Sequence, residues 1–161
     1  MPWDIVQPAS GATLSIGANE CGITRIHFHG AELPDCGPRD PRHPLIVEAA
    51  RQLTRYFAGE LHEFTLPLDL HGTDFQRRVW QALCQIPYGR TISYKELAAR
   101  VGSPQGFRAA GSANGKNPVP IVVPCHRVIE SGGGLGGFGG GLAYKRRLLD
   151  LESQFLLEDH A

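Results

Sequence analysis

The segment TISYKELAARVGSPQGFRAAGSANGKNP, residues 91–118, constrains the fold more than any other part of the chain, because it encodes two short helices in close succession. Ser93 followed by Glu96 forms a capping box that begins a helix of about two turns, and Gly102 is suited to end it. Ser103-Pro104 then predicts the start of a second helix, with a capping residue before a proline at the first helical position. Two short helices joined by a glycine-containing turn are typical of a helix-turn-helix.

The second of these helices has an unusual composition for a reader of base sequence. Residues 109–113 are Ala-Ala-Gly-Ser-Ala, without the Asn, Gln or Arg side chains that contact base edges in the major groove. Small side chains allow a close approach, and Arg108 is the one long cation near the helix start. This favours shallow contact with a minor groove, with one side chain probing the base stack. A packed helix with an ordinary surface arginine, unrelated to DNA, is the alternative.

The charge distribution fits DNA binding but does not decide it. The 161-residue chain has no net charge, yet residues 71–147 carry eleven Lys or Arg against three Asp or Glu. Residues 1–70 carry five against nine. The second segment is basic enough to lie against a polyanion, although a solvated basic face would have the same composition.

The composition is that of an ordinary globular protein, at 42% apolar and 20% charged residues. Its length allows one domain or two small lobes. The chain has no apolar run long enough to span a bilayer, and its start, MPWDIVQPAS, lacks the pattern of a signal peptide. We therefore expect no membrane partner and a location in the cytoplasm, with a bacterial cytosol as a plausible setting.

The first lobe, residues 1–71, is predicted to combine a short antiparallel sheet with a helix. Residues 12–28 alternate apolar and polar around a turn, which predicts a β-hairpin. Residues 45–58 have the spacing of an amphipathic helix, and FTLPLDL at 64–70 fits a third short strand.

The second lobe, residues 72–161, is predicted to be mainly helical, so the fold class is α+β. A helix begins at Thr73 or Asp74, and a C-terminal helix covers 142–157. On that last helix, Lys145, Arg146 and Arg147 fall on the polar face, while Glu152 falls among residues that face inward. A buried acid needs a partner.

The four cysteines favour neither a disulfide framework nor a metal ribbon, because no CxxC pair exists. A metal site in the first lobe could in principle be assembled, although the spacing follows no known ligand pattern. Its candidate ligands are Cys21, His27, His29, Cys36 and His43. We expect half-buried cysteines and loop histidines instead.

Cys125 is the strongest catalytic candidate. It follows an apolar β-branched run and a proline, where a strand must end and a pocket can open. His126 is next to it, an imidazole is the usual base for a thiolate nucleophile, and Glu152 could orient that imidazole. In an extended chain, however, adjacent side chains point to opposite faces. Either the chain turns at Cys125-His126, or a water molecule bridges the two.

A segment with eight glycines in eleven residues, 131–141, follows the cysteine. Composition alone predicts a flexible linker. Its place beside a candidate nucleophile favours another interpretation, in which glycines let the backbone close against a flat ligand.

PCHRV followed by this glycine-rich segment resembles the family of O6-alkylguanine-DNA alkyltransferases, the methylated-DNA–protein-cysteine methyltransferases. The resemblance extends backward through NPVPIVVPCHRVI and GTDFQRRVWQAL…IPYGRTISYKELA, and forward through GGFGGGLAYKRRLLDLE. It covers nearly all of residues 72–157, whereas the first lobe agrees mainly in its layout and in YFAGEL. PCHRV in this setting is a far more specific motif than a bare Cys-His pair.

The resemblance implies a role for each residue of a reacting site. Cys125 corresponds to the nucleophile that takes the alkyl group from guanine O6. His126 corresponds to a base that acts through a water molecule, and Glu152 to the carboxylate that holds it. Tyr94 matches the tyrosine that assists proton delivery to the departing guanine and crowds the 3′ phosphate. Asn117 matches the asparagine that braces the site beneath the cysteine.

The resemblance also implies DNA contacts and a base pocket. Arg108 corresponds to the arginine that enters the base stack in place of the extruded nucleotide. Four residues match positions near the phosphates: Gln76, Lys95, Ser103 and Ser131. The alkylguanine pocket corresponds to Val128, Gly136, Phe138 and Gly139. The implied partner is double-stranded DNA with O6-alkylguanine, and O4-alkylthymine as a second lesion, acted on by a monomer without cofactor or metal. Whether molecules cluster on DNA is left open.

Two departures from the family pattern stand out. Phe138 lies where many members have tyrosine, so the pocket wall keeps an aromatic face but loses a hydroxyl, and we expect weaker or altered discrimination but not loss of transfer. Some members bind zinc in the first lobe, and here Thr24 and Leu66 fall near two of the ligand positions. We therefore expect no zinc.

Two other functions fit part of the pattern. A non-catalytic, alkyltransferase-like lesion-binding protein would share the helix-turn-helix, but such proteins usually replace the cysteine that is present here. A cysteine hydrolase would need a clear oxyanion arrangement and would not need a helix-turn-helix.

Overall fold

The structure is a computed structural model that describes residues 1–33 and 36–159, with side chains up to residue 156. The chain divides into two compact units, Met1–His71 and Gly72–Ala161. A three-stranded antiparallel sheet in the first unit and several helices in the second confirm the predicted α+β class.

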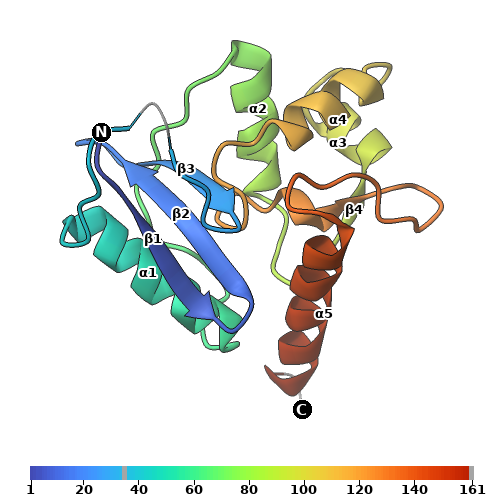
Figure 1. Cartoon of the computed structure of the whole chain (residues 1–161). Coiled ribbons are helices and arrows are strands. Elements are labelled where there is room, and N and C mark those ends of the chain that lie inside the picture. Colours follow the sequence, from blue (N-terminus) through green and yellow to red (C-terminus); the bar gives the residue numbers. More distant parts are fainter. Residues whose placement is uncertain (34–35, 160–161) are drawn as a thin grey trace. The chain divides into compact units, whose positions relative to one another are not determined.

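The sheet of the first unit has the order β1 (Trp3–Ala9), β2 (Ala12–Ala18), β3 (Ile23–Phe28), as Figure 1 shows. The predicted hairpin is β2 and β3, with Leu14 opposite Phe28 and Ile16 opposite Ile26. Helix α1 (Pro44–Phe57) packs against the sheet, so the core of this unit lies between them.

The third strand predicted at 64–70 is wrong, since this segment makes only one isolated bridge, between Leu68 and Ile23. Pro67 has no N–H to donate, although its carbonyl accepts from Ile23 at 2.8 Å. The third strand is instead β1 at the N-terminus. Its pairing with β2 is irregular between Val6 and Ala9, around a proline, which hid it in the sequence.

The second unit is built around three short helices, α2 (Asp74–Leu83), α3 (Tyr94–Arg100) and α4 (Phe107–Gly115), which pack on one another. Thr73 caps α2 through a full capping box, and the hydroxyl of Ser93 accepts the backbone N–H of Glu96 at the start of α3. The buried Trp80 of α2 donates its indole N–H to the carbonyl of Ala113 in α4, at 2.9 Å.

The predicted start of the second helix at Ser103-Pro104 is wrong by about one turn. Helix α4 begins at Phe107, with Gly106 as its N-cap. Residues 103–106 form a tight turn instead, in which the N–H of Gly106 donates to the carbonyl of Ser103 at 2.8 Å. Proline at the second position and glycine at the fourth favour such a turn, which competes with the helix start.

Helix α5 (Leu142–Asp159) is the predicted C-terminal helix, and Figure 1 shows it as the last element of the second unit. Charged residues interrupt its apolar positions. Along the described parts of the chain, no helix combines the length and apolar character needed to cross a membrane.

Candidate active site

Cys125 lies at the start of a single 3₁₀ turn, Cys125–Arg127, and not at the end of a strand. The apolar run before it forms a tight loop, closed by the N–H of Val123 donating to the carbonyl of Val119 at 2.9 Å. Prolines 118, 120 and 124 remove the N–H groups that a strand would need, so the predicted strand is wrong. Ile121 within the loop has a positive φ of 74°, a strained conformation for a β-branched residue.

The chain does turn at Cys125-His126, in the 3₁₀ helix, but the turn brings no direct hydrogen bond from Cys125 to Nδ1 of His126 among the described residues. Both residues are buried; Cys125 is 6% exposed and His126 is fully enclosed. Burial raises the pKa of the Cys125 thiol to about 11, although Asn117 and Lys145 act in the opposite direction. The resting site therefore holds a neutral thiol that must lose its proton to react.

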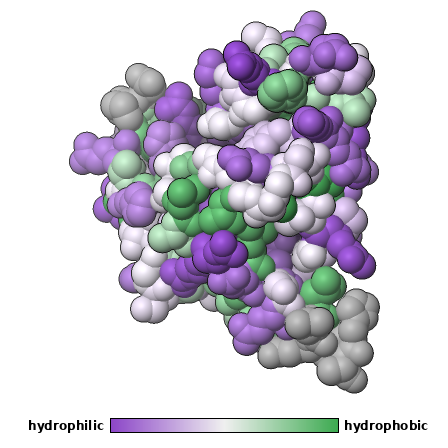
Figure 2. All heavy atoms as spheres, turned by 90° about the vertical axis from the view of Figure 1, so that its right-hand side faces the viewer, coloured by the Kyte–Doolittle hydropathy of each residue, from purple (hydrophilic) through white to green (hydrophobic). Residues whose placement is uncertain are grey.

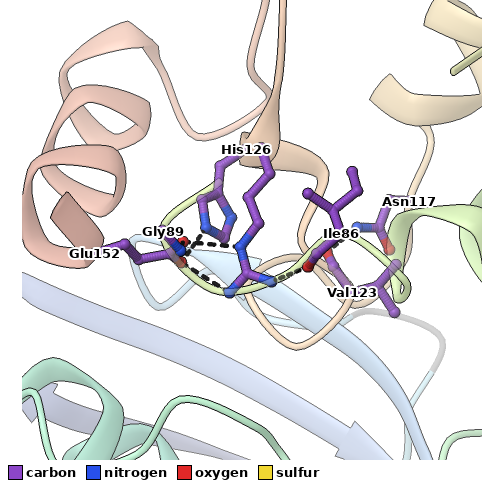
Figure 3. Close-up of polar contacts among 7 residues, drawn as sticks. Ile86, Gly89, Asn117, Val123, His126 and Glu152 are labelled. Carbon is purple, nitrogen blue, oxygen red and sulfur yellow. Dashed lines mark hydrogen bonds and ion pairs between the residues drawn. The ribbon is translucent and has the colours of Figure 1, made fainter. Parts of the chain in front are cut away.

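A buried polar network begins at His126. Its Nε2 lies 2.6 Å from Oε2 of Glu152 on α5, and the two side chains point toward one another in Figure 3. Burial is the main reason that the pKa of His126 is lowered, so the ring is neutral at neutral pH. A neutral ring whose Nε2–H donates a hydrogen bond to the carboxylate keeps an acceptor lone pair at Nδ1. That Nδ1 atom is buried and has no hydrogen-bond partner among the described residues.

Glu152 is held by several donors at once. Arg127 contacts both of its oxygens, at 2.8 and 3.1 Å, and the backbone N–H of Gly89 donates to Oε1 at 3.1 Å. Burial alone would raise the pKa of Glu152, but His126 and Arg127 more than offset it and hold that pKa well below its usual range. The carboxylate is thus a fixed, ionised acceptor for the histidine.

Arg127 was not singled out from the sequence, although it lies inside PCHRV. Besides its two contacts with Glu152, it donates through Nη1 to the carbonyl of Ile86 at 2.7 Å, and it lies over the ring of Tyr88. It is only 6% exposed. The expectation that Glu152 needs a partner could have pointed to it, since a buried acid next to a neutral histidine calls for a cation.

Two asparagines fix the backbone around the cysteine. Asn117 donates to the carbonyl of Val123 at 2.7 Å and accepts the N–H of Val119 at 2.9 Å, so it braces the strained loop from both ends. Asn114, which sequence reasoning missed, is buried and donates to the carbonyl of Cys125 at 3.4 Å. Both lie at or just after the end of α4, and the Asn117 bond appears in Figure 3.

Lys145 was predicted on the polar face of the last helix, and this is wrong because it is fully buried. Its ammonium group donates to the carbonyls of Val128 at 2.7 Å and Gly137 at 3.3 Å, and also to that of Leu135. It lies 5.8 Å from the centre of the Tyr94 ring. Helical periodicity could not reveal these partners, because they are backbone carbonyls of a distant segment.

The glycine-rich segment is therefore a loop held in place by hydrogen bonds, and not a flexible linker. It begins with a turn in which the N–H of Glu130 donates to Gly134 at 2.8 Å, and Lys145 then binds its middle. Gly136 has a φ of 71°, and a Cβ there would lie 2.5 Å from the Tyr94 hydroxyl. The glycine thus lets Tyr94 lie against the loop. Burial is the main reason that the pKa of Tyr94 is raised.

Of the remaining pocket candidates, Phe138 and Gly139 belong to this loop and Val128 precedes it. Val128 is buried in β5 (Val128–Ile129), which pairs in parallel with β4 (Ile92–Ser93). Phe138 is half-buried and Gly139 is exposed. The structure thus brings Cys125, Tyr94 and the loop into one region through the contacts of Lys145.

The residues predicted to contact DNA lie mostly on the surface. Arg108, Lys95 and Ser131 are exposed, and Ser103 is half-buried in the turn before α4. Gln76 already uses its side-chain oxygen to accept the N–H of Thr73 at 3.0 Å in the capping box. Its side-chain amide nitrogen is the group that could still meet a phosphate.

Within residues 1–33 and 36–159, no group of three or more His, Cys, Asp or Glu is arranged to hold a metal ion. The four cysteines are free; Cys21 and Cys84 are exposed, Cys36 is half-buried and Cys125 is buried. The expectation of half-buried cysteines in the first lobe is therefore wrong for Cys21, and that of loop histidines is wrong for His27, which lies in β3.

A buried cysteine followed by a histidine that is paired with a carboxylate is the kind of arrangement that cysteine-dependent transferases and hydrolases use. Residues 74–154 match the family described as "6-O-methylguanine DNA methyltransferase, DNA binding domain". Residues 13–70 match its "ribonuclease-like domain". The chain therefore belongs to the methylated-DNA–protein-cysteine methyltransferase family, a class of transferases, as the sequence resemblance indicated.

Relatives cover almost the whole chain. The methylated-DNA–protein-cysteine methyltransferase of Methanosarcina barkeri is 46% identical over 97% of this chain and 99% of its own length. That of Methanosarcina acetivorans is 53% identical over 94% and 98%. The crystal structure of Mycobacterium tuberculosis OGT in complex with DNA is 44% identical, with a TM-score of 0.88 over 96% of this chain and 94% of that one.

Proposed function

We propose that this chain repairs DNA by moving the alkyl group of O6-alkylguanine, in one irreversible step, to the sulfur of Cys125. The observation that carries the proposal is the enclosed Cys125-His126 turn tied to an ionised Glu152 by a 2.6 Å hydrogen bond. The family relationship, and the relatives named for the same transfer, support it.

The thiol is activated by its neighbours. The free Nδ1 of His126 accepts the proton of Cys125 through a bridging water molecule, while Glu152 holds the ring and stabilises the imidazolium that forms. Lys145 lowers the pKa of the thiol and so favours the thiolate once the proton has left. Arg127 keeps Glu152 ionised throughout.

The transfer step then exchanges one bond for another. The thiolate attacks the alkyl carbon, an S–C bond forms, and the C–O6 bond breaks with its electron pair going to guanine. The hydroxyl of Tyr94 gives a proton to the departing base, and the proton taken from the thiol restores that hydroxyl. Water does not hydrolyse the resulting thioether, so each molecule reacts once. The chain needs no cofactor for these steps.

The lesion must leave the base stack before a buried thiol can reach it. We assign the exposed Arg108 of α4 to the gap in the stack, and the small residues that follow it to close contact with the minor groove. Lys95, Ser103, Ser131 and the amide of Gln76 lie toward phosphates. The pocket of Val128, Gly136, Phe138 and Gly139 receives the base. It accepts O4-alkylthymine as well, and a monomer acts in the compartment that holds the DNA, the cytoplasm of a bacterial cell.

Counting transferred groups tests this proposal. The protein is mixed with excess duplex DNA that contains one radiolabelled O6-methylguanine per molecule. The radiolabel transferred to the protein is counted, and mass spectrometry locates the methylated residue. We expect one methyl group per chain, on Cys125, and none on Cys125→Ala. Repeated turnover, or tight binding without transfer, would overturn the proposal.

The role of Arg108 has a separate test. Arg108→Ala should slow the repair of duplex DNA by tenfold or more, which corresponds to about 1.4 kcal/mol. Its reaction with free O6-benzylguanine should be unchanged, because a free base needs no extrusion. Equal losses on both substrates would contradict the role in base flipping.

A further inference from the structure

Phe107, the first residue of α4, is a large apolar side chain that is only partly covered by the rest of the protein. It is 44% exposed and directly precedes Arg108. The other large hydrophobic side chains this exposed within the described residues are Met1, Val47 and Leu142, which belong to other elements. On the face shown in Figure 2, hydrophilic residues lie around a group of hydrophobic residues near the middle of the view.

The other exposed side chains of α4 that follow Phe107 and Arg108 are small. Ala109, Ser112 and Gly115 are the next exposed positions of the helix, and none of them projects far from the backbone. Ala110, Ala113 and Asn114 form the buried face toward the neighbouring helices. Phe107 and Arg108 are therefore the two long side chains at this end of the helix, one apolar and one cationic.

Phe107 also lies on the side of α4 that leads toward Tyr94. Gly111, one turn further along the helix, faces the Tyr94 ring, since a Cβ there would lie 3.5 Å from its Cδ1. Residues four apart share one face of a helix, so Phe107 and Gly111 are neighbours on this flank. Arg108, three residues before Gly111, is a neighbour on this flank as well, so both long side chains lie next to the part of α4 that faces Tyr94.

We propose that Phe107 is a second wedge for the minor groove, which packs its ring against the bases and sugars next to the gap that Arg108 fills. The inference rests on the proposed function, because it needs α4 to be the DNA-contacting helix. Apolar side chains inserted at a base step partly unstack it and stabilise a bent, opened duplex. The two side chains then have different roles. Arg108 occupies the space of the extruded nucleotide, and Phe107 keeps the neighbouring base step open.

The test compares Phe107→Ala and Phe107→Leu with the wild-type chain on three substrates that carry the alkylated base. On duplex DNA we expect Phe107→Ala to be slower by about 5- to 150-fold, the range found when an aromatic ring that stacks on a base is removed. Phe107→Leu should keep most of the rate, because it retains an apolar wedge. On single-stranded DNA and on free O6-benzylguanine both variants should react like the wild type. Val47→Ala, an equally exposed apolar position on α1, is the matched control.

The outcomes separate the inference from the proposed function. If Arg108→Ala is slow on duplex DNA and Phe107→Ala is not, the wedge is refuted and the DNA-contacting helix stands. If neither variant is slow on duplex DNA, α4 does not contact DNA, and both the wedge and the proposed role of Arg108 are refuted. If Phe107→Ala is equally slow on free O6-benzylguanine, its role is structural and the wedge is also refuted.

Discussion

The two sides of Cys125 are held in place by different kinds of contact. On one side, His126, Glu152 and Arg127 form a buried network of paired side chains. On the other, the ammonium group of Lys145 donates to backbone carbonyls of β5 and of the glycine loop. The first side is fixed by complementary charges, and the second by one cation that gathers carbonyl groups. The two sides should therefore respond differently when a single residue is removed.

The largest loss of stability is expected from Glu152→Ala. It leaves Arg127 as a buried cation without its carboxylate, which costs about 3–5 kcal/mol. Urea unfolding should show this loss, and methyl transfer should fall sharply because His126 loses its partner. Glu96→Ala is the control, since its pair with Arg100 is exposed and should contribute at most about 1 kcal/mol. Equal losses in the two variants would mean that the buried network does not hold this side.

Low pH should remove the stability that the ionised Glu152 contributes to the folded state. The pKa of Glu152 is lower in the folded chain than its ordinary value of 4.5, so the folded state is favoured above that value. The contribution is lost as the pH falls from 4.5 toward the folded pKa. The stability difference between the wild type and Glu152→Gln should therefore shrink below pH 4.5, as urea unfolding at a series of pH values would show. A difference that stays constant down to pH 2 would contradict the ionised network.

Lys145→Met should have a smaller effect on stability and a large effect on the loop. The substitution keeps the length of the side chain but leaves three carbonyls without their donor. The buried carbonyl of Val128 costs about 1–3 kcal/mol, and the part-buried carbonyls of Leu135 and Gly137 cost less because water can reach them. Hydrogen exchange at residues 132–141 should accelerate, and transfer should slow even with free O6-benzylguanine. Arg146→Met, at the exposed neighbouring position, should change neither property. Unchanged exchange in Lys145→Met would show that the loop is held in another way.

Gly136→Ala should cost about 1–2 kcal/mol through its left-handed backbone alone. Its Cβ would also press on the Tyr94 hydroxyl. Two matched glycines separate these causes: Gly133 has a positive φ but open space around it, and Gly132 has open space without the unusual φ. We expect transfer to decline in Gly136→Ala only, while Gly133→Ala loses stability but not activity. Equal activity in all three variants would show that the contact between residue 136 and Tyr94 does not affect transfer.

The contrast between the two sides also explains what the sequence could reveal. Helix starts at Thr73 and Ser93 and the inward position of Glu152 follow local rules of capping and periodicity, and all three were predicted. The start of α4 was missed because a turn at Ser103 competes locally with a helix. Lys145 was misplaced because its partners are backbone carbonyls, which every residue carries and which no pattern marks.

The smallest expected effect concerns the thiol itself. Burial is the main reason that the pKa of Cys125 is about 11, and Asn117 and Lys145 are the side chains that lower it. Nδ1 of His126 makes no direct hydrogen bond to the thiol among the described residues, so the thiol pKa should respond more to the Lys145 side of the site than to the network side. The rate of alkylation by iodoacetamide, followed from pH 7 to 11.5 with Cys125→Ala subtracted, reports this pKa. It should rise in Lys145→Met and Asn117→Ala and stay unchanged in Glu152→Gln. A shift in Glu152→Gln alone would reverse the assignment, because the network would then set the charge of the sulfur and the lysine would only hold the loop.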